Sequence, residues 1–522
     1  MKNLILFFTL AIFFSCTQKR SDNFQIVNVS GDYQTPYFED STRAEKILKY
    51  KSVIDSIFSK SARANHNPAI AYGIVVDNKL IYSNAVGYAN LEKKIVADSK
   101  SLFRIASMTK SFTAMSILRL RDEGKLQLSD PVAKYIPEIA SLKYPTKDAS
   151  PITIFNLLTM SAGFPEDNPW GDRKLSDTDQ ELIDFVKSGI SFSTNPGSQF
   201  EYSNLGYGLL GRIISNVSGQ HYQDYVVEKI LRPLGMNDCE FEYEKIPVNK
   251  LALGYRWEDN QWKPEALLKD GSYASMGGMI CTIDDFAKYI SFLLSSWPAR
   301  NEDEVGPVKR SSAREMQQPW KFRGFLPNFK THGGELCPRT FSYGFGLGWR
   351  LDCHDNVAIS HSGGLPGFGS VHILLPDHGV GIVAFSNLTY ANMGSSASQA
   401  LDTLVLLANL KKRVLPVSPT PKKVQDEIVR LLPAWGDEHD SLFAENFFPD
   451  ISKAYRKKET DEMLSKIGKI TFVGKMQPEN LLRGSFDLVG EKGMIEVYFT
   501  LTPEVEPKVQ YLNLEVKNLQ TN

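Results

Sequence analysis

Several features that would indicate a particular class of protein are scarce in this 522-residue sequence. It has only five cysteines, and none lies in the Cys-x-x-Cys or His-paired spacing of a metal site. Acidic and basic residues nearly balance at a formal net charge of -1, and Lys and Arg form no long run. No repeat or low-complexity tract interrupts the chain. We therefore expect a folded protein of two or three domains, with no nucleic-acid partner, metal or other cofactor.

The apolar run near the start, from Leu4 to Phe14, is too short to span a bilayer as a permanent helix. A positive residue precedes it and Ser15-Cys16 follows, which is typical of an export signal over residues 1–16. A small residue before this cysteine resembles a bacterial lipobox, which implies cleavage before Cys16 and lipidation of its thiol. We expect an exported, periplasmic bacterial protein anchored to the membrane through Cys16, with ordinary secretion as the alternative.

The other four cysteines are spread along the chain, at Cys239, Cys281, Cys337 and Cys353. An exported protein can form disulfides, but the spacing of these residues assigns no pairing. We expect buried or unpaired thiols, and a disulfide is the alternative.

Apolar periodicity after the tether of residues 17–40 predicts a large domain over residues 41–412. Two strands are expected near its start and three near its end, with a mostly helical stretch between 145 and 300. The expected strands are 69–76, 79–86, 356–361, 370–375 and 380–385. Strands from both ends of the domain fit one antiparallel sheet with a helical insertion, an α+β fold.

Three prolines, Pro416, Pro419 and Pro421, mark a linker over residues 413–422. We expect this segment neither to extend a helix nor to join a central strand. The 100 residues that follow, 423–522, are enough for a small α+β domain. Its pattern predicts helices over 424–433, 438–447 and 451–467, then strands over 470–474, 482–489, 494–502 and 509–516.

The most informative motif is Ser107-x-x-Lys110, in an apolar helical stretch. Residues three apart share a helix face, so the hydroxyl and the amine can meet as a nucleophile and the group that activates it. Ser107 stands at the expected helix start, where the helix dipole stabilises a developing oxyanion. Taken alone, the spacing also fits a surface serine and a solvated lysine.

Two further motifs follow in the sequence. In Tyr202-Ser203-Asn204, the tyrosine can act as a phenolate-like base near a lysine, and the asparagine can orient a substrate amide. The alternative is a buried tyrosine beside a turn. In His361-Ser362-Gly363-Gly364, a strand enters a glycine-rich turn, where a peptide substrate could pair with the strand edge. His361 alone also fits a polar core residue.

Ser-x-x-Lys, Tyr-x-Asn and His-x-Gly in this order resemble the serine β-lactamase-like superfamily, in its class C β-lactamase, D-alanyl-D-alanine carboxypeptidase and esterase group. The resemblance covers residues 60 to 400. It implies a β-lactamase/transpeptidase-like fold: an antiparallel sheet with helices on both faces and a helical subdomain. The C-terminal region resembles the cystatin-like, NTF2-like architecture, in which a helix packs in a cone-shaped sheet.

The resemblance also implies roles for the matching residues. Ser107 is the nucleophile, and Lys110 and Tyr202 share the proton transfer. Asn204 contacts the substrate amide. The backbone N–H groups of Ser107 and Gly364 form the oxyanion hole, and no metal is needed.

The third motif begins with His361 where typical β-lactamases have lysine, a change more usual in peptidases and esterases of this group. The resemblance implies that His361 and Gly363 bind substrate, with His361 as a weak, titratable anchor for a substrate carboxylate. We expect a serine hydrolase that acts on D-amino-acid-containing peptides or cell-wall fragments. Alternatives are a carboxylesterase, a weak β-lactamase, or a non-catalytic protein that binds muropeptides or β-lactams.

Overall fold

The computed structural model describes residues 33–517, and the chain divides into two compact units between Val414 and Leu415. The larger unit begins at Thr35, and the smaller contains the C-terminal region. Each unit is described by itself.

A nine-stranded sheet forms the centre of the larger unit, in the order β3-β2-β1-β13-β12-β11-β10-β9-β8. Every neighbouring pair is antiparallel. The strands are β1 (Ala69–Val76), β2 (Lys79–Asn90), β3 (Ile95–Val96), β8 (Lys321–Leu326), β9 (Arg339–Tyr343), β10 (Gly348–Leu351), β11 (Val357–Leu365), β12 (Phe368–Leu375) and β13 (Val380–Ser386). Two small sheets pair β4 (Phe103–Arg104) with β7 (Ile280–Cys281), and β5 (Tyr255–Glu258) with β6 (Gln261–Pro264).

The central pair of strands comes from opposite ends of the unit. Strand β1 pairs with β13 in a register that places Ile70 opposite Ser386 and Val76 opposite Val380. Both strands are buried along their whole length, as their continuous apolar runs indicate. The prediction of one antiparallel sheet built from both ends of the domain is therefore confirmed.

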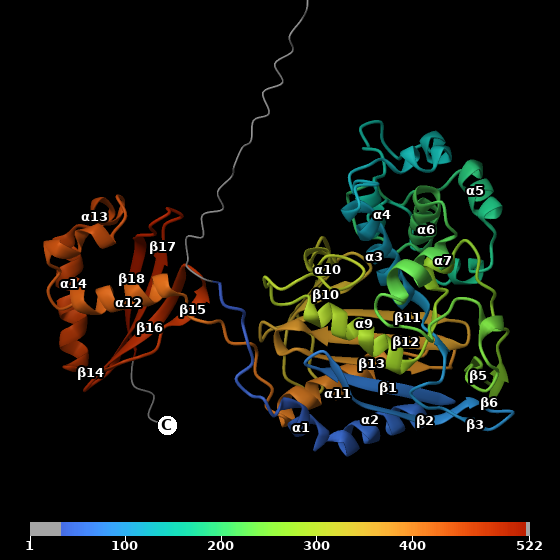
Figure 1. Cartoon of the computed structure of the whole chain (residues 1–522), viewed down its shortest axis with the longest axis horizontal. Helices are drawn as coiled ribbons and strands as arrows, with labels where there is room; N and C mark the ends of the chain where they lie inside the picture. Colours follow the sequence, from blue (N-terminus) through green and yellow to red (C-terminus); the bar gives the residue numbers. More distant parts are fainter. Residues whose placement is uncertain (1–32, 518–522) are drawn as a thin grey trace, which may run out of the picture. The chain divides into compact units, whose positions relative to one another are not determined.

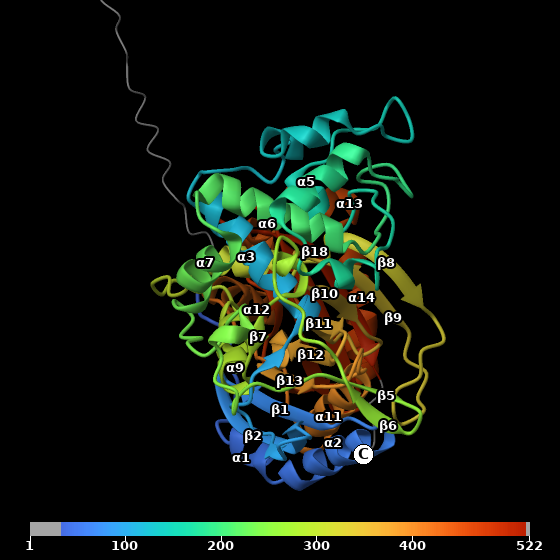
Figure 2. The ribbon, with the colours of Figure 1, turned by 90° about the vertical axis from the view of Figure 1, so that its right-hand side faces the viewer.

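Helices cover both faces of this sheet. Figures 1 and 2 show α3 to α7 gathered at the end of the larger unit away from α1 and α2. The helices are α1 (Arg43–Leu48), α2 (Lys51–Ala64), α3 (Thr109–Asp122), α4 (Ile154–Leu158), α5 (Asp179–Ser188), α6 (Asn204–Ser218), α7 (Tyr222–Val226), α8 (Ala274–Gly277), α9 (Ile283–Ser295), α10 (Arg310–Met316) and α11 (Gly394–Leu407).

Alternate residues of β1 serve two different cores. Ile70 and Tyr72 pack with α2 and α11, whereas Ala71 and Val75 belong to the core shared with α3, α6 and α9. This division follows from the period of two along a strand. The sheet is thus buried on both faces. The core that contains Ala71 and Val75 also holds α3, the helix that begins just after Ser107.

The smaller unit has helices α12 (Pro419–Leu431), α13 (Phe447–Asp450) and α14 (Lys453–Ile467), followed by an antiparallel sheet. Its strands are β14 (Ile470–Val473), β15 (Gln477–Asn480), β16 (Arg483–Gly490), β17 (Met494–Leu501) and β18 (Val509–Lys517). The expectation that the proline segment stays outside helices is wrong, because Pro419 and Pro421 lie in the first turn of α12. A first-turn N–H has no intrahelical partner, so proline is tolerated there.

The four cysteines of the larger unit form two disulfides, contrary to the expectation of thiols. Cys239 pairs with Cys281, and Cys337 pairs with Cys353. An isolated bridge between Glu240 and Ile280 brings the first pair together. The second pair lies just beyond the ends of β9 and β10. Both pairings depend on strand neighbours that the cysteine spacing does not reveal.

The expected signal peptide and lipidation at Cys16 lie outside the described residues. Within residues 33–517, no helix is both long and apolar enough to cross a membrane.

Candidate active site

Ser107 lies in the 3₁₀ turn Ala106–Met108, which leads directly into α3. The residue before it, Ala106, has a φ of 50°, a left-handed conformation that costs free energy for a residue with a Cβ. Hydrogen bonds hold this turn in place: Ser370 Oγ donates to the Ile105 carbonyl and Thr109 Oγ1 to the Ala106 carbonyl, each at 2.7 Å. Ser107 is therefore presented by a rigid turn at the helix start, as the sequence predicted.

Gly363 on β11 packs against the same turn. A Cβ at this position would lie 2.3 Å from the Ile105 carbonyl oxygen and 3.0 Å from the Ala106 Cβ. The glycine thus permits the strand to approach the turn that carries Ser107. We expected Gly363 to bind substrate, whereas the side on which a Cβ would stand packs against the turn that carries Ser107.

Lys110 is fully buried and its Nζ has three hydrogen-bond partners. Nζ lies 3.0 Å from Ser107 Oγ, 2.7 Å from Asn204 Oδ1 and 2.7 Å from the Met276 carbonyl oxygen. The last two atoms only accept hydrogen bonds. A neutral amine has two N–H groups, which these two acceptors occupy, so its lone pair is left for the Ser107 hydroxyl.

Burial lowers the pKa of Lys110 from 10.5 to about 7, and the nearby carboxylates of Asp172 and Asp167 oppose this shift. A substantial fraction of Lys110 is therefore neutral near neutral pH. This protonation state and the hydrogen-bond geometry together allow Lys110 to accept a proton from Ser107.

Tyr202 lies next to Lys110, with its ring centre 5.0 Å from Lys110 Nζ. Burial raises the pKa of Tyr202 well above 10, and the negative charges of Asp172 and Asp167 add to the increase. The expected phenolate-like base is therefore disfavoured. A neutral phenol can still donate its proton and receive another, so Tyr202 is suited to relay protons beside Lys110.

Asn204 is the first residue of α6 and is completely buried. Its Oδ1 accepts the hydrogen bond from Lys110, and its Nδ2 lies 3.4 Å from Asp172 Oδ1. The expected contact with a substrate amide is not available to a buried side chain that is satisfied on both sides. Asn204 instead orients Lys110.

His361 lies on β11 and uses both ring nitrogens within the protein. Nδ1 lies 2.6 Å from the Ser362 carbonyl oxygen, so Nδ1 carries a proton and Nε2 accepts from Tyr343 Oη at 3.0 Å. Burial, and then the charge of Lys110, lower the pKa of His361 to about 3. His361 is therefore neutral at physiological pH, and the expected titratable carboxylate anchor is wrong.

Four of the predicted residues line one cavity of about 340 Å³: Ser107, Tyr202, His361 and Gly364. Lys110, Asn204 and Gly363 are not among its lining residues. Ser107 and Gly364, whose backbone N–H groups were expected to form the oxyanion hole, both line it. The lining residues are Ser107, Glu166, Asn168, Phe200, Tyr202, Arg323, Tyr343, Gly348, Ser360, His361, Ser362 and Gly364. The cavity thus places Ser107 beside the glycine-rich end of β11.

Arg323 on β8 is the functional candidate that the sequence did not indicate. Its guanidinium lies 4.6 Å from the ring centre of Phe200, at the cavity wall. No ion pair joins Arg323 to a carboxylate among residues 33–517, so its charge is available to a ligand. No local motif surrounds this residue, and only the pairing of β8 with β9 brings it to the site.

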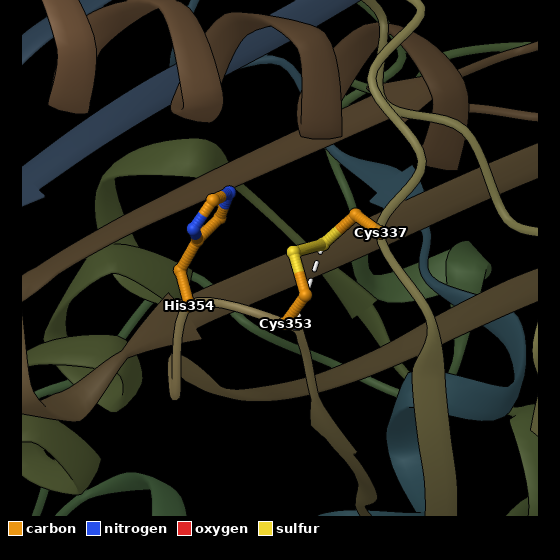
Figure 3. Close-up of side chains that lie close together, drawn as sticks. All are labelled: Cys337, Cys353 and His354. Carbon is orange, nitrogen blue, oxygen red and sulfur yellow. Dashed lines mark hydrogen bonds between the residues drawn. A yellow bond between two sulfur atoms is a disulfide. The ribbon is translucent and has the colours of Figure 1, made fainter.

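A second cluster of candidate ligand groups lies apart from this cavity. Cys337, Cys353 and His354 have ligand atoms within 4.8 Å of one another, and Figure 3 shows the imidazole beside the two sulfurs. The sulfurs are bonded to each other as a disulfide. Metal sites use thiolates, so this oxidised pair cannot supply them.

Two bacterial proteins are similar to this chain in sequence. The chain is 32% identical to Protein flp of Staphylococcus aureus (strain COL) over 340 residues, which cover 64% of this chain and 62% of that protein. It is 26% identical to penicillin-binding protein 4* of Bacillus subtilis (strain 168) over 325 residues, 59% of this chain and 65% of that one. The chain therefore spans less than two thirds of the length of these relatives.

Solved structures share the fold. The octameric penicillin-binding protein homologue from Pyrococcus abyssi aligns with a TM-score of 0.57 at 22% identity, over 90% of this chain and 94% of that chain. A class C beta-lactamase aligns with a TM-score of 0.55 at 20% identity, over 68% and 96% of the respective chains. The predicted β-lactamase/transpeptidase-like α+β fold is thus confirmed. The family model named Beta-lactamase matches residues 54–406, and the chain therefore belongs to the beta-lactamase family.

Proposed function

We propose that this protein is a serine hydrolase that forms an acyl-enzyme at Ser107. The observation that carries this proposal is the hydrogen-bond pattern of Lys110, whose neutral form directs its lone pair at Ser107 Oγ. Lys110 takes the hydroxyl proton as Ser107 attacks a carbonyl carbon. The N–H groups of Ser107 and Gly364 stabilise the oxyanion, and Tyr202 relays a proton to the leaving group.

The substrates that fit best are D-amino-acid-containing peptides or cell-wall fragments, as for a D-alanyl-D-alanine carboxypeptidase. Such a peptide ends in a carboxylate, and the free guanidinium of Arg323 can bind this group at the cavity wall. The hydroxyl of Ser362 lines the same cavity and can add a hydrogen bond. Arg323 thus takes the role that we first expected of His361.

Two alternatives use the same cavity. A carboxylesterase or weak β-lactamase would share the nucleophile and the oxyanion hole and differ only in the leaving group. A non-catalytic protein that binds muropeptides or β-lactams would need no proton transfer from Lys110. The geometry around Lys110 favours catalysis over binding alone.

The first experiment compares the wild-type protein, from residue 17 onward, with Ser107→Ala. Each is incubated with a fluorescent penicillin and with a fluorophosphonate probe, and we expect covalent labelling of the wild type alone. Equal labelling of both proteins, or of neither, would contradict an acyl-enzyme at Ser107. A panel of D-Ala-D-Ala peptide, D-amino amide, short-chain ester and cephalosporin then identifies the leaving group.

Three further predictions from the sequence accompany this proposal: export, lipidation at Cys16 and an NTF2-like fold for the C-terminal unit. Incorporation of labelled palmitate, with loss in Cys16→Ala, tests the anchor. An experimental structure of the C-terminal unit, compared with known NTF2-like domains, tests the fold.

A further inference from the structure

A buried carboxylate next to the candidate active site has no part in the chemistry described so far. Asp172 lies in the 3₁₀ turn Gly171–Lys174 and has no exposed surface. Its Oδ1 lies 3.4 Å from Asn204 Nδ2, and its Oδ2 accepts from Tyr390 Oη at 3.1 Å. Burying a carboxylate away from water costs free energy, so its presence beside Asn204 calls for an explanation.

The effect of Asp172 on Asn204 follows from hydrogen-bond chemistry. An asparagine amide can present either its oxygen or its NH₂ group to a neighbour, but an ionised carboxylate accepts only from the NH₂ group. Asp172 therefore favours the orientation in which the amide oxygen of Asn204 faces Lys110, 2.7 Å from Nζ. The side-chain amide of Asn168 is the other neighbour of Nδ2, at 3.1 Å. If the Asn204 amide were reversed, its NH₂ group would face the N–H groups of Lys110, and the two donors could not form a hydrogen bond with each other.

The position of Asp172 is fixed from two sides. On one side the preceding residue, Gly171, packs so closely that a Cβ there would lie 2.7 Å from the Cβ of Asn204. On the other side Tyr390, which donates to Asp172, lies against Gly364, where a Cβ would be 2.9 Å from its ring. The carboxylate is thus held between the Asn204 side chain and the strand of the expected oxyanion hole.

Other ionisable groups also face Lys110, and none is placed as Asp172 is. Asp167 accepts from the backbone N–H groups of Asn204 and Leu205, at 2.6 and 2.8 Å, and so serves the start of α6. Among residues 33–517, the other titratable groups near Lys110 include the phenols of Tyr202 and Tyr207 and the neutral imidazole of His361. Around Asp172 itself the charged neighbours are Lys110, Asp167 and Arg173.

We propose that Asp172 is a positioning residue that, through Asn204, holds Lys110 in the arrangement that accepts the Ser107 proton. Its negative charge also stabilises the protonated amine that forms when Lys110 takes this proton. The inference rests on the proposed acyl-enzyme chemistry at Ser107.

The test is the pH dependence of fluorophosphonate labelling in wild type and in Asp172→Asn, which keeps the size of the side chain. In wild type the labelling rate rises as Lys110 loses its proton. Loss of the negative charge destabilises protonated Lys110, so its pKa falls and the rise moves to lower pH, by about one unit. The rate at high pH also falls, by about tenfold, because the Asn204 amide is no longer fixed.

A second variant separates position from charge. Gly171→Ala keeps the carboxylate of Asp172 but forces the turn away from Asn204. We therefore expect slower fluorophosphonate labelling at high pH, whereas the pH at which the labelling rate rises stays that of wild type. The control is Asp184→Asn, an exposed carboxylate on α5, which leaves both quantities unchanged.

Circular dichroism and thermal melting establish that each variant is folded. A folded Asp172→Asn protein with the wild-type profile would overturn the role of Asp172, as would an unchanged rate in Gly171→Ala. Either result leaves the proposed function intact. A wild-type protein without Ser107-dependent labelling would instead refute the proposed function.

Discussion

The Nζ of Lys110 lies 2.7 Å from the carbonyl oxygen of Met276, a partner that can accept a hydrogen bond but never donate one. This contact ties one N–H of the lysine to α8 in every protonation state. Together with Asn204 it leaves only one direction, toward Ser107, in which a proton can be gained or lost. The direction of proton transfer is thus determined by one backbone carbonyl and one side-chain amide.

The first prediction concerns pH. The pKa of Lys110 is lowered to about 7, and only the neutral amine accepts the Ser107 proton, so kcat/KM for a neutral ester rises as the pH increases through about 7. Below this pH the protonated lysine is inactive. His361, whose pKa is lowered to about 3, adds no transition between pH 5 and 9. A profile that is flat, or that falls across this range, would contradict the assignment of Lys110 as the base.

The second prediction concerns Tyr202→Phe. This change keeps the ring above Lys110 and removes the hydroxyl that relays protons, so kcat/KM falls by about 10²-fold. The pH at which activity rises stays near that of wild type, because Lys110 remains the base. Tyr207→Phe is the matched control: Tyr207 is also buried near Lys110, but its hydroxyl donates to the Leu158 carbonyl. Similar losses in both variants would argue against the relay.

The third prediction concerns Arg323→Ala. The KM for a D-Ala-D-Ala peptide rises by about tenfold, as expected for loss of a hydrogen-bonded charge pair. The KM for a neutral ester changes little, because that substrate has no carboxylate. Arg256→Ala, an exposed arginine on β5, serves as the control. Steady-state kinetics on both substrates provide the measurement, and an equal change for both would contradict a carboxylate-binding role.

The fourth prediction concerns stability. The disulfide between Cys337 and Cys353 spans a sequence separation of 16 residues. Its replacement by two serines lowers the free energy of unfolding by about 3 kcal/mol, chiefly because the unfolded chain gains freedom. Urea denaturation with and without a reducing agent measures this loss. Reduction of the wild type also opens the Cys239–Cys281 disulfide and should give a larger decrease. A double-serine variant as stable as the oxidised wild type would contradict a stabilising role for the Cys337–Cys353 disulfide.

The sequence predicts the parts of the site that depend on short spacing. Ser107 and Lys110 meet because they lie three residues apart at a helix start, and Tyr202, Asn204 and His361 were found by their order in the chain. The strands β1 and β13 were also recognisable, because their apolar runs are bounded by turn residues.

The remaining features depend on contacts between distant segments. His361 is neutral because the fold buries it and brings it near the charge of Lys110, which together lower its pKa. Asp172 and Arg323 lie in segments without any recognisable motif. Only the folded chain brings Arg323 to the cavity and Asp172 to the side chain of Asn204. The prolines were misjudged for a different reason, since the same residue can end one helix and begin the next.

The pairing of β1 with β13 has a consequence for synthesis of the protein. The ribosome completes β1 and the turn that carries Ser107 long before it makes β11, β12 and β13. Because the central strand lacks its partner until then, a nascent chain contains Ser107 without the glycine-rich strand that completes the cavity. Such long-range pairing is slow to form, so the cavity is complete only once nearly the whole larger unit has emerged.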